Sequence, residues 1–394
     1  MDTKILADRY IFNTYKRFPI TLVKGRGCRV WDEKGREYLD FIGGIAVCAL
    51  GHSSEVVSNA LKTQSEILVH VSNLFYTRPQ AELAELLVKH SFADKVFFCN
   101  SGAEANEAAI KLVRRYSAEN YGPQRYVIIA MENSFHGRTM ATLTATGQKK
   151  IQKGFDPLLN GFRHVPFNDI NALKDAIDER VCAILLEPIQ GEGGVICADR
   201  DYLRGVEEIC KEKDILLVLD EVQVGMGRTG RLFAYEHYGI EPDVMTLAKA
   251  MANGLPIGAM LSVERVASAF GPGAHASTFG GTPLVCAVSK AVLEYILNEG
   301  VLDNCASMGK YLIEGLKEMK TKYPIIRDIR GMGLIVGVEL DIKADEVVQR
   351  CMQNGILINS PKENVIRFLP PLIITQREID QLLNTLNSIF KEYV

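Results

Sequence analysis

The pattern of apolar and polar positions predicts that the middle of the chain folds as strands and helices in turn. Short uninterrupted apolar runs, typical of strands buried on both faces, alternate with segments that are apolar at every third or fourth position, typical of helices. The strands are expected at 95–100, 125–130, 181–189 and 215–220, and the helices at 103–116, 170–177 and 202–211. This order predicts an α/β fold with a largely parallel sheet and helices on its faces.

The two ends of the chain have a different pattern. Residues 1–50 alternate around the turn at Lys34 and Gly35, which predicts a meander of strands. The last third has amphipathic helices at 287–295, 302–320, 346–353 and 378–390, and strands at 333–340 and 364–369. We therefore expect a large domain over residues 51–285, and a small α+β domain formed by residues 286–394 together with the meander, residues 1–50.

Two of the apolar runs end in residues that can carry chemistry. Asp220 and Glu221 follow the run from Ile215 to Leu219, and a second β-prone run, Asp243 to Ala248, is followed by Lys249. Open α/β sheets bind their ligands at the carboxyl ends of strands. We therefore expect a carboxylate and an amine at the same sheet edge.

A carboxylate and a lysine at one sheet edge are what pyridoxal phosphate (PLP) requires. A lysine amine holds this cofactor as a Schiff base, and a carboxylate keeps its ring nitrogen protonated. Lys249 would supply the amine and Asp220 the carboxylate. In the alternative interpretation, Asp220 caps a turn and Lys249 is a solvated strand end. A dinucleotide site at Gly225, Gly227 and Gly230 is disfavoured, because no helical pattern follows this G-x-G-x-x-G motif.

A helix start that suits a phosphate follows the strand expected at 95–100. Ser101 and Glu104 have the spacing of a capping box, and Gly102 between them leaves the backbone bare. Backbone N–H groups and the helix dipole favour an anion at such a position. The alternative is a capped helix without a ligand.

Three further segments carry candidate binding groups. Phe135 in SFHGRT could stack on a pyridine ring, and Arg138 could hold a carboxylate through two parallel hydrogen bonds. A lone His or Phe in such a loop, here His136 or Phe135, usually serves packing. Glu187 and Glu192 in EPIQGEGG follow a strand, where each could equally be a solvated acid. Arg367 interrupts an apolar strand and needs an anion or an acidic partner there.

Composition and charge exclude several other classes of protein. The net charge is -3 and the sequence pI is about 6.2, with Lys and Arg spread along the chain, so no nucleic-acid or membrane surface is indicated. The nine cysteines are odd in number and never spaced C-x-x-C, which argues against a disulfide framework or a metal site. No signal peptide or membrane-spanning run is recognisable. We expect a cytoplasmic protein.

Seven motifs, in this order and spacing, resemble the class III PLP-dependent aminotransferases. They are SGAEANEAAIK, SFHGRT, EPIQGEGG, LDEVQVGMGRTG, Lys249 with GLPIGA, STFGG and IRFLPPL. The resemblance runs from about Tyr15 to the carboxyl terminus. It implies the aspartate-aminotransferase fold (fold type I), with a large domain built on a mixed, mostly parallel sheet beside a small α+β domain. The segments YLDFIGGIAVCALGH, ATLTATGQ and RGMGLIVGVEL look most like the acetylornithine branch of the family in bacteria.

The resemblance also implies pyridoxal 5'-phosphate as the cofactor and a set of residues that hold it. These are Ser101, Gly102, Ala103, Phe135, Asp220, Gln223, Lys249 and Thr278. Lys249 and Asp220 would be catalytic, Gln223 would lie near the ring hydroxyl, and Phe135 would stack on the ring. Thr278 would reach the phosphate of the other subunit's cofactor, so the resemblance implies a homodimer with its sites at the subunit interface.

The substrates that the resemblance implies are a small-molecule amino donor and 2-oxoglutarate. For the acetylornithine branch the donor is the terminal amine of N2-acetylornithine, in arginine biosynthesis. Arg138 would bind the distant carboxylate, and Glu192 and Arg367 would form a switchable pair near the α-carboxylate position. Ornithine, succinylornithine, succinyldiaminopimelate and 4-aminobutyrate remain alternative donors, and a glutamate 1-semialdehyde aminomutase is a more distant alternative. Thr282 departs from the asparagine that the family often has there.

Overall fold

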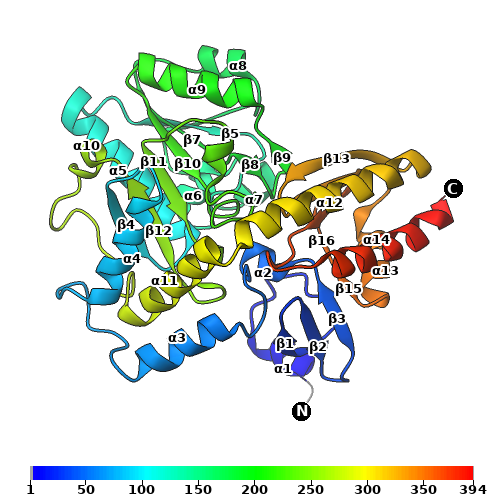
Figure 1. The fold of residues 1–394 in the computed structure, drawn as a ribbon. Helices are drawn as coiled ribbons and strands as arrows, with labels where there is room; N and C mark the ends of the chain where they lie inside the picture. Colours follow the sequence, from blue (N-terminus) through cyan, green and yellow to red (C-terminus); the bar gives the residue numbers. More distant parts are fainter. Residues whose placement is uncertain (1–2, 394) are drawn as a thin grey trace.

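The computed structural model describes residues 3–393. A seven-stranded sheet forms the centre of the larger part of the molecule (Figure 1). Its strands follow the order β4-β12-β11-β10-β7-β5-β6. β12 runs antiparallel to its neighbours β11 and β4, and the other six strands point the same way. The strands are β4 Lys95–Cys99, β5 Val127–Met131, β6 Phe162–Val165, β7 Val181–Leu186, β10 Leu216–Asp220, β11 Val244–Leu247 and β12 Gly258–Ser262.

Helices cover both faces of this sheet because its strands present apolar side chains to each face in turn. On β10, Leu216 and Val218 pack in one cluster with α5, whereas Leu217 and Leu219 pack in another with α9. Strands buried on both faces have uninterrupted apolar runs, which is how the sequence predicted them. The helices on and beside the sheet are α3 Glu55–Ser65, α4 Arg78–Lys89, α5 Gly102–Tyr121, α6 Met140–Ala145, α8 Ile170–Asp175, α9 Arg200–Glu212 and α10 Glu264–Ala267.

The amino-terminal segment forms a smaller sheet with a strand from near the other end of the chain. The expected meander is present as β1 Leu22–Arg26, β2 Arg29–Asp32 and β3 Glu37–Asp40. β15 Ile356–Leu357 joins it parallel to β3, with Ile356 opposite Leu39. The prediction missed α1 Thr3–Tyr10, none of whose side chains is buried, so no apolar face marks this helix in the sequence.

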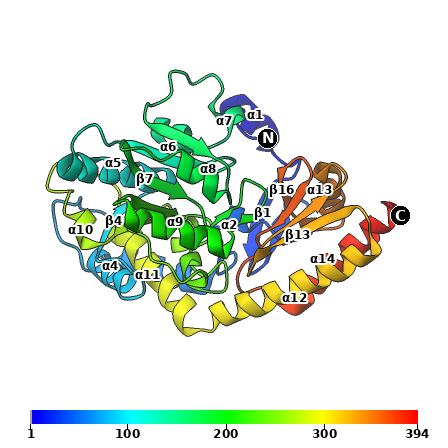
Figure 2. The same cartoon turned by 90° about the horizontal axis from the view of Figure 1, so that it is seen from above.

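A third sheet closes the carboxyl-terminal part of the chain. Its strands are antiparallel, in the order β13-β14-β17-β16, and α12 and α13 pack against it, with α14 packed on both helices. These elements are β13 Ile326–Met332, β14 Ile335–Leu340, β16 Asn359–Lys362, β17 Val365–Phe368, α12 Val301–Lys322, α13 Ala344–Gln353 and α14 Gln376–Phe390. α11 Pro283–Asn298 packs on α3 and α4, and α12 then runs beside β13 (Figure 2). The domain boundaries at residues 50 and 285 stay a prediction.

The remaining elements are short. They are α2 Gly43–Ala46, α7 Lys149–Gln152, β8 Ile189–Gln190, β9 Ile196–Cys197 and the 3-10 helices η1 Ala234–His237, η2 Lys249–Ala252 and η3 Lys391–Tyr393. The G-x-G-x-x-G segment at 225–230 forms turns and does not open a helix. Within residues 3–393 no helix has the length and apolar character needed to cross a membrane, and no cluster of His, Cys, Asp and Glu could hold a metal ion.

Candidate active site

Asp220 ends β10 within a buried polar network. β10 pairs in parallel with β11, which places Asp220 opposite Thr246, three residues before Lys249, so the acid and the amine leave one sheet edge as expected. Oδ2 of Asp220 accepts a hydrogen bond from Asn106 Nδ2 at 2.7 Å and lies 2.8 Å from His136 Nδ1. The hydroxyl of Thr246 in turn donates to Asn106 Oδ1 at 2.8 Å. The carboxylate is therefore held directly by side chains on two segments, and Thr246 on a third segment holds Asn106 in place.

Lys249 leaves β11 with its backbone in the left-handed region, at φ 43°. Its side chain lines a cavity of about 430 Å³ together with Asp220, and it makes no hydrogen bond or ion pair to any residue that the structure describes. Burial lowers the pKa of Lys249, which favours the neutral, nucleophilic amine. The turn after it is tied to the amino-terminal segment, because Asn253 accepts from the N–H of Leu50 at 2.7 Å and donates to the carbonyl of Gly51 at 2.9 Å.

The start of α5 forms another wall of the cavity, through Ser101, Gly102 and Ala103. The Ser101 hydroxyl accepts from the N–H of Glu104 at 3.2 Å, which is half of the expected capping box. The other half differs from the prediction, because the Glu104 carboxylate accepts from the N–H of Asn100 at 2.6 Å and not from that of Ser101. The helix start that the sequence proposed for a phosphate therefore does face the cavity.

The loop after β5 brings Phe135 and Arg138 to the cavity. The N–H of Phe135 donates to Glu187 Oε1 at 2.8 Å, and the guanidinium carbon of Arg138 lies 5.6 Å from the centre of the Phe135 ring. Arg138 is exposed and has no carboxylate partner within residues 3–393. Glu187 is not a solvated acid, because it is 5% exposed, and burial together with the charge of Asp220 raises its pKa well above the usual value.

An ion pair between Glu192 and Arg367 borders the same cavity, which Glu192 and Gln223 line. Arg367 is only 1% exposed, and its Nη1 donates to Glu192 Oε1 at 2.6 Å and to Gln223 Oε1 at 3.3 Å. Burial alone would raise the pKa of Glu192, but the charges of Arg367 and Lys249 hold it below the usual value. The sequence-based expectation that Arg367 needs an acidic partner is confirmed.

Thr278 lies outside the cavity that contains Lys249. It lines a separate small pocket with His70 and Asn73, in a loop whose next residue, Phe279, is 62% exposed. This loop is held by two asparagines: the amide of Asn100 donates to Ser277 Oγ at 3.2 Å, and that of Asn73 donates to the Ser277 carbonyl at 3.1 Å. The structure of one chain does not bring Thr278 to the other predicted residues, so its role stays a prediction.

Sequence reasoning missed Asn106 and treated His136 as a packing residue. Asn106 is 1% exposed on the side of α5 that buries Ala105 and Ala109. The only signal in the sequence is one amide among alanines on a buried helix face. His136 is 2% exposed, and its second ring nitrogen, Nε2, has no partner among the described residues. Both residues lie within motifs that carry the family resemblance, SGAEANEAAIK and SFHGRT, but nothing in their own segments marks them as partners of Asp220.

The residues around the cavity fit pyridoxal phosphate in chemical terms. A volume of about 430 Å³ lies in the usual range for small-ligand sites. The walls supply an amine with a lowered pKa, a carboxylate held by Asn106 and His136, and a helix start suited to an anion. A side chain at Gly102 would fill part of this wall, since a Cβ there would lie 2.7 Å from Val222 Cγ1.

Residues 10–390 match the family model of the class III aminotransferases, and the chain therefore belongs to this family of PLP-dependent enzymes. Two curated relatives are named acetylornithine aminotransferase. That of Caldanaerobacter subterraneus subsp. tengcongensis is 54% identical over 385 residues, 98% of each chain. That of Methanocaldococcus jannaschii is 49% identical over 387 residues, 98% of this chain and 97% of the relative. The predicted family, reaction class and cofactor are confirmed.

Two solved structures show the same fold. The ornithine aminotransferase from Toxoplasma gondii matches with a TM-score of 0.96 at 34% identity, over 99% of this chain and 94% of that one. The N-acetylornithine aminotransferase from Stenotrophomonas maltophilia matches with a TM-score of 0.86 at 38% identity, over 99% of this chain and 98% of that one. The predicted fold, that of PLP-dependent enzymes of fold type I, is confirmed.

Proposed function

We propose that this aminotransferase moves the terminal amino group of N2-acetylornithine to 2-oxoglutarate, giving N-acetylglutamate 5-semialdehyde and glutamate, in arginine biosynthesis (EC 2.6.1.11). Relatives that carry this name are 54% and 49% identical over nearly the whole chain. In the structure, the observation that carries the proposal is the ion pair of Glu192 and Arg367 at 2.6 Å. A terminal amine brings no carboxylate to the reacting carbon, so the protein itself must neutralise a guanidinium placed there.

Lys249 and Asp220 have the chemical roles in this proposal. The bound cofactor supplies an electron sink when the C–H bond beside the reacting amine breaks. The neutral amine of Lys249 would take that proton from the substrate carbon and deliver it to the cofactor carbon bonded to the same nitrogen. Burial, which lowers the pKa of Lys249, keeps the amine competent as a base. Asp220, held in place by Asn106 and His136, would stabilise the positive charge of the ring nitrogen.

The two substrates place their carboxylates differently, and three side chains accommodate both. Arg138 would bind the carboxylate that lies far from the reacting amine in each of them, through two parallel hydrogen bonds. Glutamate has a second carboxylate beside its amine. That carboxylate would displace Glu192 from Arg367, whereas N2-acetylornithine would leave the pair intact.

The remaining cofactor contacts follow from the motifs. Ser101, Gly102 and Ala103 would bind the phosphate, Phe135 would stack on the ring, and Gln223 would lie beside the ring hydroxyl. Thr278 of a second copy would complete the phosphate site, so we propose a homodimer.

We further propose that the enzyme is cytoplasmic. All nine cysteines are free thiols and most are buried, which is typical of proteins from reducing compartments.

Ornithine is the second candidate donor. The likeness to the ornithine aminotransferase from Toxoplasma gondii, with a TM-score of 0.96, favours it on shape alone. Ornithine carries a charged α-amine where N2-acetylornithine carries a neutral amide, so the two donors need different groups around the distant end. The reacting ends of the two donors are identical, and only a direct comparison of the donors separates the two functions.

The absorbance spectrum of the purified, cofactor-loaded enzyme tests the proposal. We expect N2-acetylornithine, added without a 2-oxo acid, to convert the visible band of the bound cofactor to the near-ultraviolet band of its aminated form, and 2-oxoglutarate to restore the visible band. If the visible band is unchanged by N2-acetylornithine but is converted by ornithine, ornithine would replace N2-acetylornithine as the proposed donor. If the protein shows no visible band after incubation with the cofactor, the role proposed for Lys249 would be overturned.

A further inference from the structure

A large basic cleft adjoins the cavity of Lys249. This cleft, which we call the vestibule, has a volume of about 1600 Å³ and shares Phe135, Arg138 and Glu192 with the inner cavity. Eight basic and three acidic side chains line it. The basic ones are Lys16, Arg17, Arg138, Lys149, Lys150, Lys153, Lys343 and Lys362. The chain as a whole carries a net charge of -3, so this excess of positive charge is local.

Each acidic side chain of the vestibule already has a cationic partner. Asp345 pairs with Lys16 at 2.7 Å, Glu363 pairs with Lys343 at 3.6 Å, and Glu192 pairs with Arg367 of the inner cavity. The other six cations have no acidic partner among residues 3–393. A concave surface with one sign of charge concentrates ions of the opposite sign. The vestibule is therefore a region where anions accumulate.

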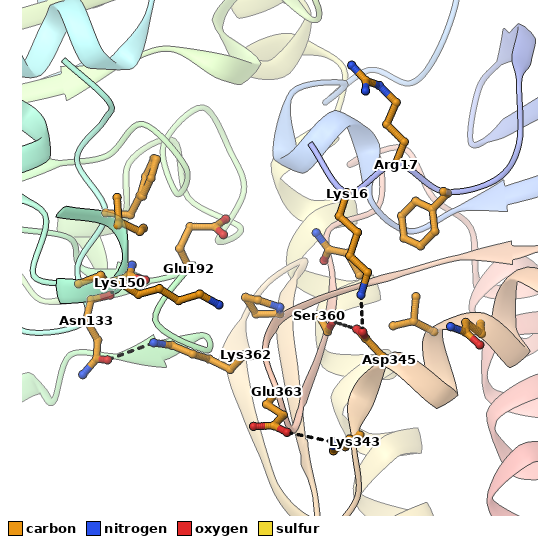
Figure 3. A pocket seen from close by; sticks show the side chains of 18 of the residues that line it. Lys16, Arg17, Asn133, Lys150, Glu192, Lys343, Asp345, Ser360, Lys362 and Glu363 are labelled. Atoms are coloured by element: carbon orange, nitrogen blue, oxygen red, sulfur yellow. Dashed lines mark hydrogen bonds and ion pairs between the residues drawn. The ribbon is translucent and has the colours of Figure 1, made fainter. Parts of the chain in front are cut away.

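Two of these lysines come from segments far apart in the sequence and lie close together in the vestibule. Figure 3 shows Lys150, from α7, and Lys362, from β16, on the side of the vestibule where Glu192 lies. Lys362 Nζ donates to Asn133 Oδ1 at 3.1 Å, which fixes it beside the loop that carries Phe135. Lys150 has no hydrogen-bond partner in the described part of the chain. It is exposed, so its charge is available to a molecule in the cleft.

The short helix that carries Lys150 is held firmly against the active-site loop. The side chain of Gln148, just before it, donates to the carbonyl of Ser134 at 3.0 Å, and that of Gln152, at its end, donates to the carbonyl of Thr146 at 2.8 Å. Lys149 and Lys150 between them are anchored through the backbone while their ammonium groups stay in solvent. The position of these two charges is therefore set by an anchored helix and not by a flexible loop.

The proposed substrates differ in charge. 2-Oxoglutarate is a dianion, whereas N2-acetylornithine carries one carboxylate and one ammonium group and is neutral overall. We propose that the vestibule selects and concentrates the dianionic 2-oxo acid ahead of the amino donor, with Lys150 and Lys362 as its charge-selecting residues. This inference rests on the proposed function for the identity of the acceptor. For a dianion about 10 Å from one ammonium group in water, the attraction corresponds to roughly fourfold in local concentration.

The test compares the two half-reactions of the cofactor-loaded enzyme over a range of ionic strength. We expect kcat/KM for 2-oxoglutarate to fall several-fold between about 0.02 M and 0.3 M salt, because the Debye length shortens from about 20 Å to below 8 Å. The kcat/KM for N2-acetylornithine stays constant within about twofold. Lys150→Met lowers the value for 2-oxoglutarate roughly fourfold at low salt, Lys150→Glu lowers it further, and both flatten its salt dependence.

The controls separate charge selection from damage to the site. Lys317→Met removes an equally exposed lysine from α12, away from the vestibule, and should change neither value. Lys362→Met, which also loses the bond to Asn133, should repeat the effect of Lys150→Met on 2-oxoglutarate. Equal losses for donor and acceptor, or no loss in Lys150→Glu, would overturn the inference while the proposed function stands. A wild-type enzyme that accepts no 2-oxoglutarate at all would overturn both.

Discussion

Arg367 can occupy a buried strand because nearby segments supply its partners. It is 1% exposed on β17, with Glu192 at 2.6 Å, Gln223 at 3.3 Å and Asn359 at 3.3 Å from its guanidinium nitrogens. Removing one partner from a buried ion pair is strongly destabilising, because the remaining charge is left uncompensated. In an active site, that uncompensated charge also becomes available to a substrate anion.

Replacing Glu192 by Ala should therefore shift donor preference. We expect the ratio of kcat/KM for glutamate over that for N2-acetylornithine to rise at least tenfold. The α-carboxylate of glutamate no longer has to displace an internal anion, whereas bound N2-acetylornithine leaves Arg367 unpaired. Steady-state rates with both donors measure this ratio. Glu264→Ala, an exposed acid on α10, serves as the control. An unchanged ratio in Glu192→Ala would rule out the switch.

The sequence could predict those residues that stand out against the pattern of their own segment. Lys249 and Asp220 follow apolar strands, and Arg367 interrupts one, so each was visible as an exception to a local pattern. Asn106 and Glu187 depend on what packs against them. Their burial follows from the neighbouring strands, and their segments alone do not distinguish a buried polar residue from a solvated one.

At the scale of elements, the start of α5 depends on the absence of a side chain. A Cβ on Gly102 would lie 2.7 Å from Cγ1 and 2.9 Å from Cγ2 of Val222, in the turn after β10. These distances are shorter than any normal contact between carbon atoms, so the helix start and the turn that follows Asp220 pack directly on each other. The phosphate-binding role proposed for this helix start therefore depends on a contact with the turn.

Gly102→Ala should weaken cofactor binding, and a second substitution should restore it. We expect the single variant to bind pyridoxal phosphate about tenfold less tightly and to lose about 1–3 kcal/mol of stability, the usual cost of overpacking. Gly102→Ala with Val222→Ala removes the clash and should recover most of both. Titration of the cofactor-free protein, followed by its visible band, measures the affinity. A double variant no better than Gly102→Ala would contradict this account.

A half-buried histidine holds the segment between β3 and α3 in place. His52 Nε2 lies 2.7 Å from Asp40 Oδ2, and Asp40 Oδ1 accepts from the N–H of Ile42 at 2.8 Å. The hydrogen bond to Asp40 raises the pKa of His52 from 6.5 to about 10. The folded state therefore binds this proton more tightly than the unfolded state does. The resulting stabilisation is complete below about pH 6.5 and is lost as the pH rises through about 10.

This pair predicts a measurable dependence of stability on pH. Between about pH 6.5 and pH 10 the wild-type protein should lose on the order of 2 kcal/mol more than His52→Asn does, less than the pKa shift alone implies because the side chain is 21% exposed. Urea unfolding at several pH values gives both curves. His52→Asn should be less stable than the wild type at pH 6. The same slope in both proteins would show that His52 does not cause the dependence.

Local pattern predicted the elements that bury an apolar face, and missed those defined by contacts with distant segments. Five of the seven strands of the central sheet and the long helices were found within a few residues of their bounds, whereas β6 and β12 were not predicted. The helix α1 buries nothing and was missed. β12 runs antiparallel to both β11 and β4, and this direction depends on its pairing with distant segments and not on the residues of β12 alone.

At the scale of the whole molecule, the proposed cofactor site includes one residue, Thr278, that a single chain does not bring to it. Thr278 lies away from the cavity of Lys249, beside Phe279, which is 62% exposed. Phe75, which lines the same small pocket, is 65% exposed, and its neighbour in sequence, Leu74, is 86% exposed. A protein rarely leaves such groups in solvent, which supports the proposed homodimer.

Mixing two inactive or weakened variants tests whether Thr278 acts across the dimer. Lys249→Ala lacks the amine, and Thr278→Ala should bind the cofactor about tenfold more weakly through loss of a hydrogen bond to phosphate. In a mixed dimer, the Lys249→Ala subunit would place its intact Thr278 at the site that contains Lys249 of the other subunit. After the variants are unfolded and refolded together, we expect wild-type affinity at one of the two sites of each mixed dimer, measured by cofactor titration. No recovery in the mixture would place Thr278 in its own subunit's site or outside any site.

The pairing of β3 with β15 sets the order in which the molecule can be completed during synthesis. Leu39 lies opposite Ile356, so the edge of the first sheet stays unpaired until β15 is synthesised, close to the end of translation. Closing so long a loop is slow, and until then β3 exposes unpaired backbone groups that invite pairing with other chains. Chains that stop before residue 356 leave this edge open, and they should aggregate even though the central sheet, complete by residue 262, has already formed.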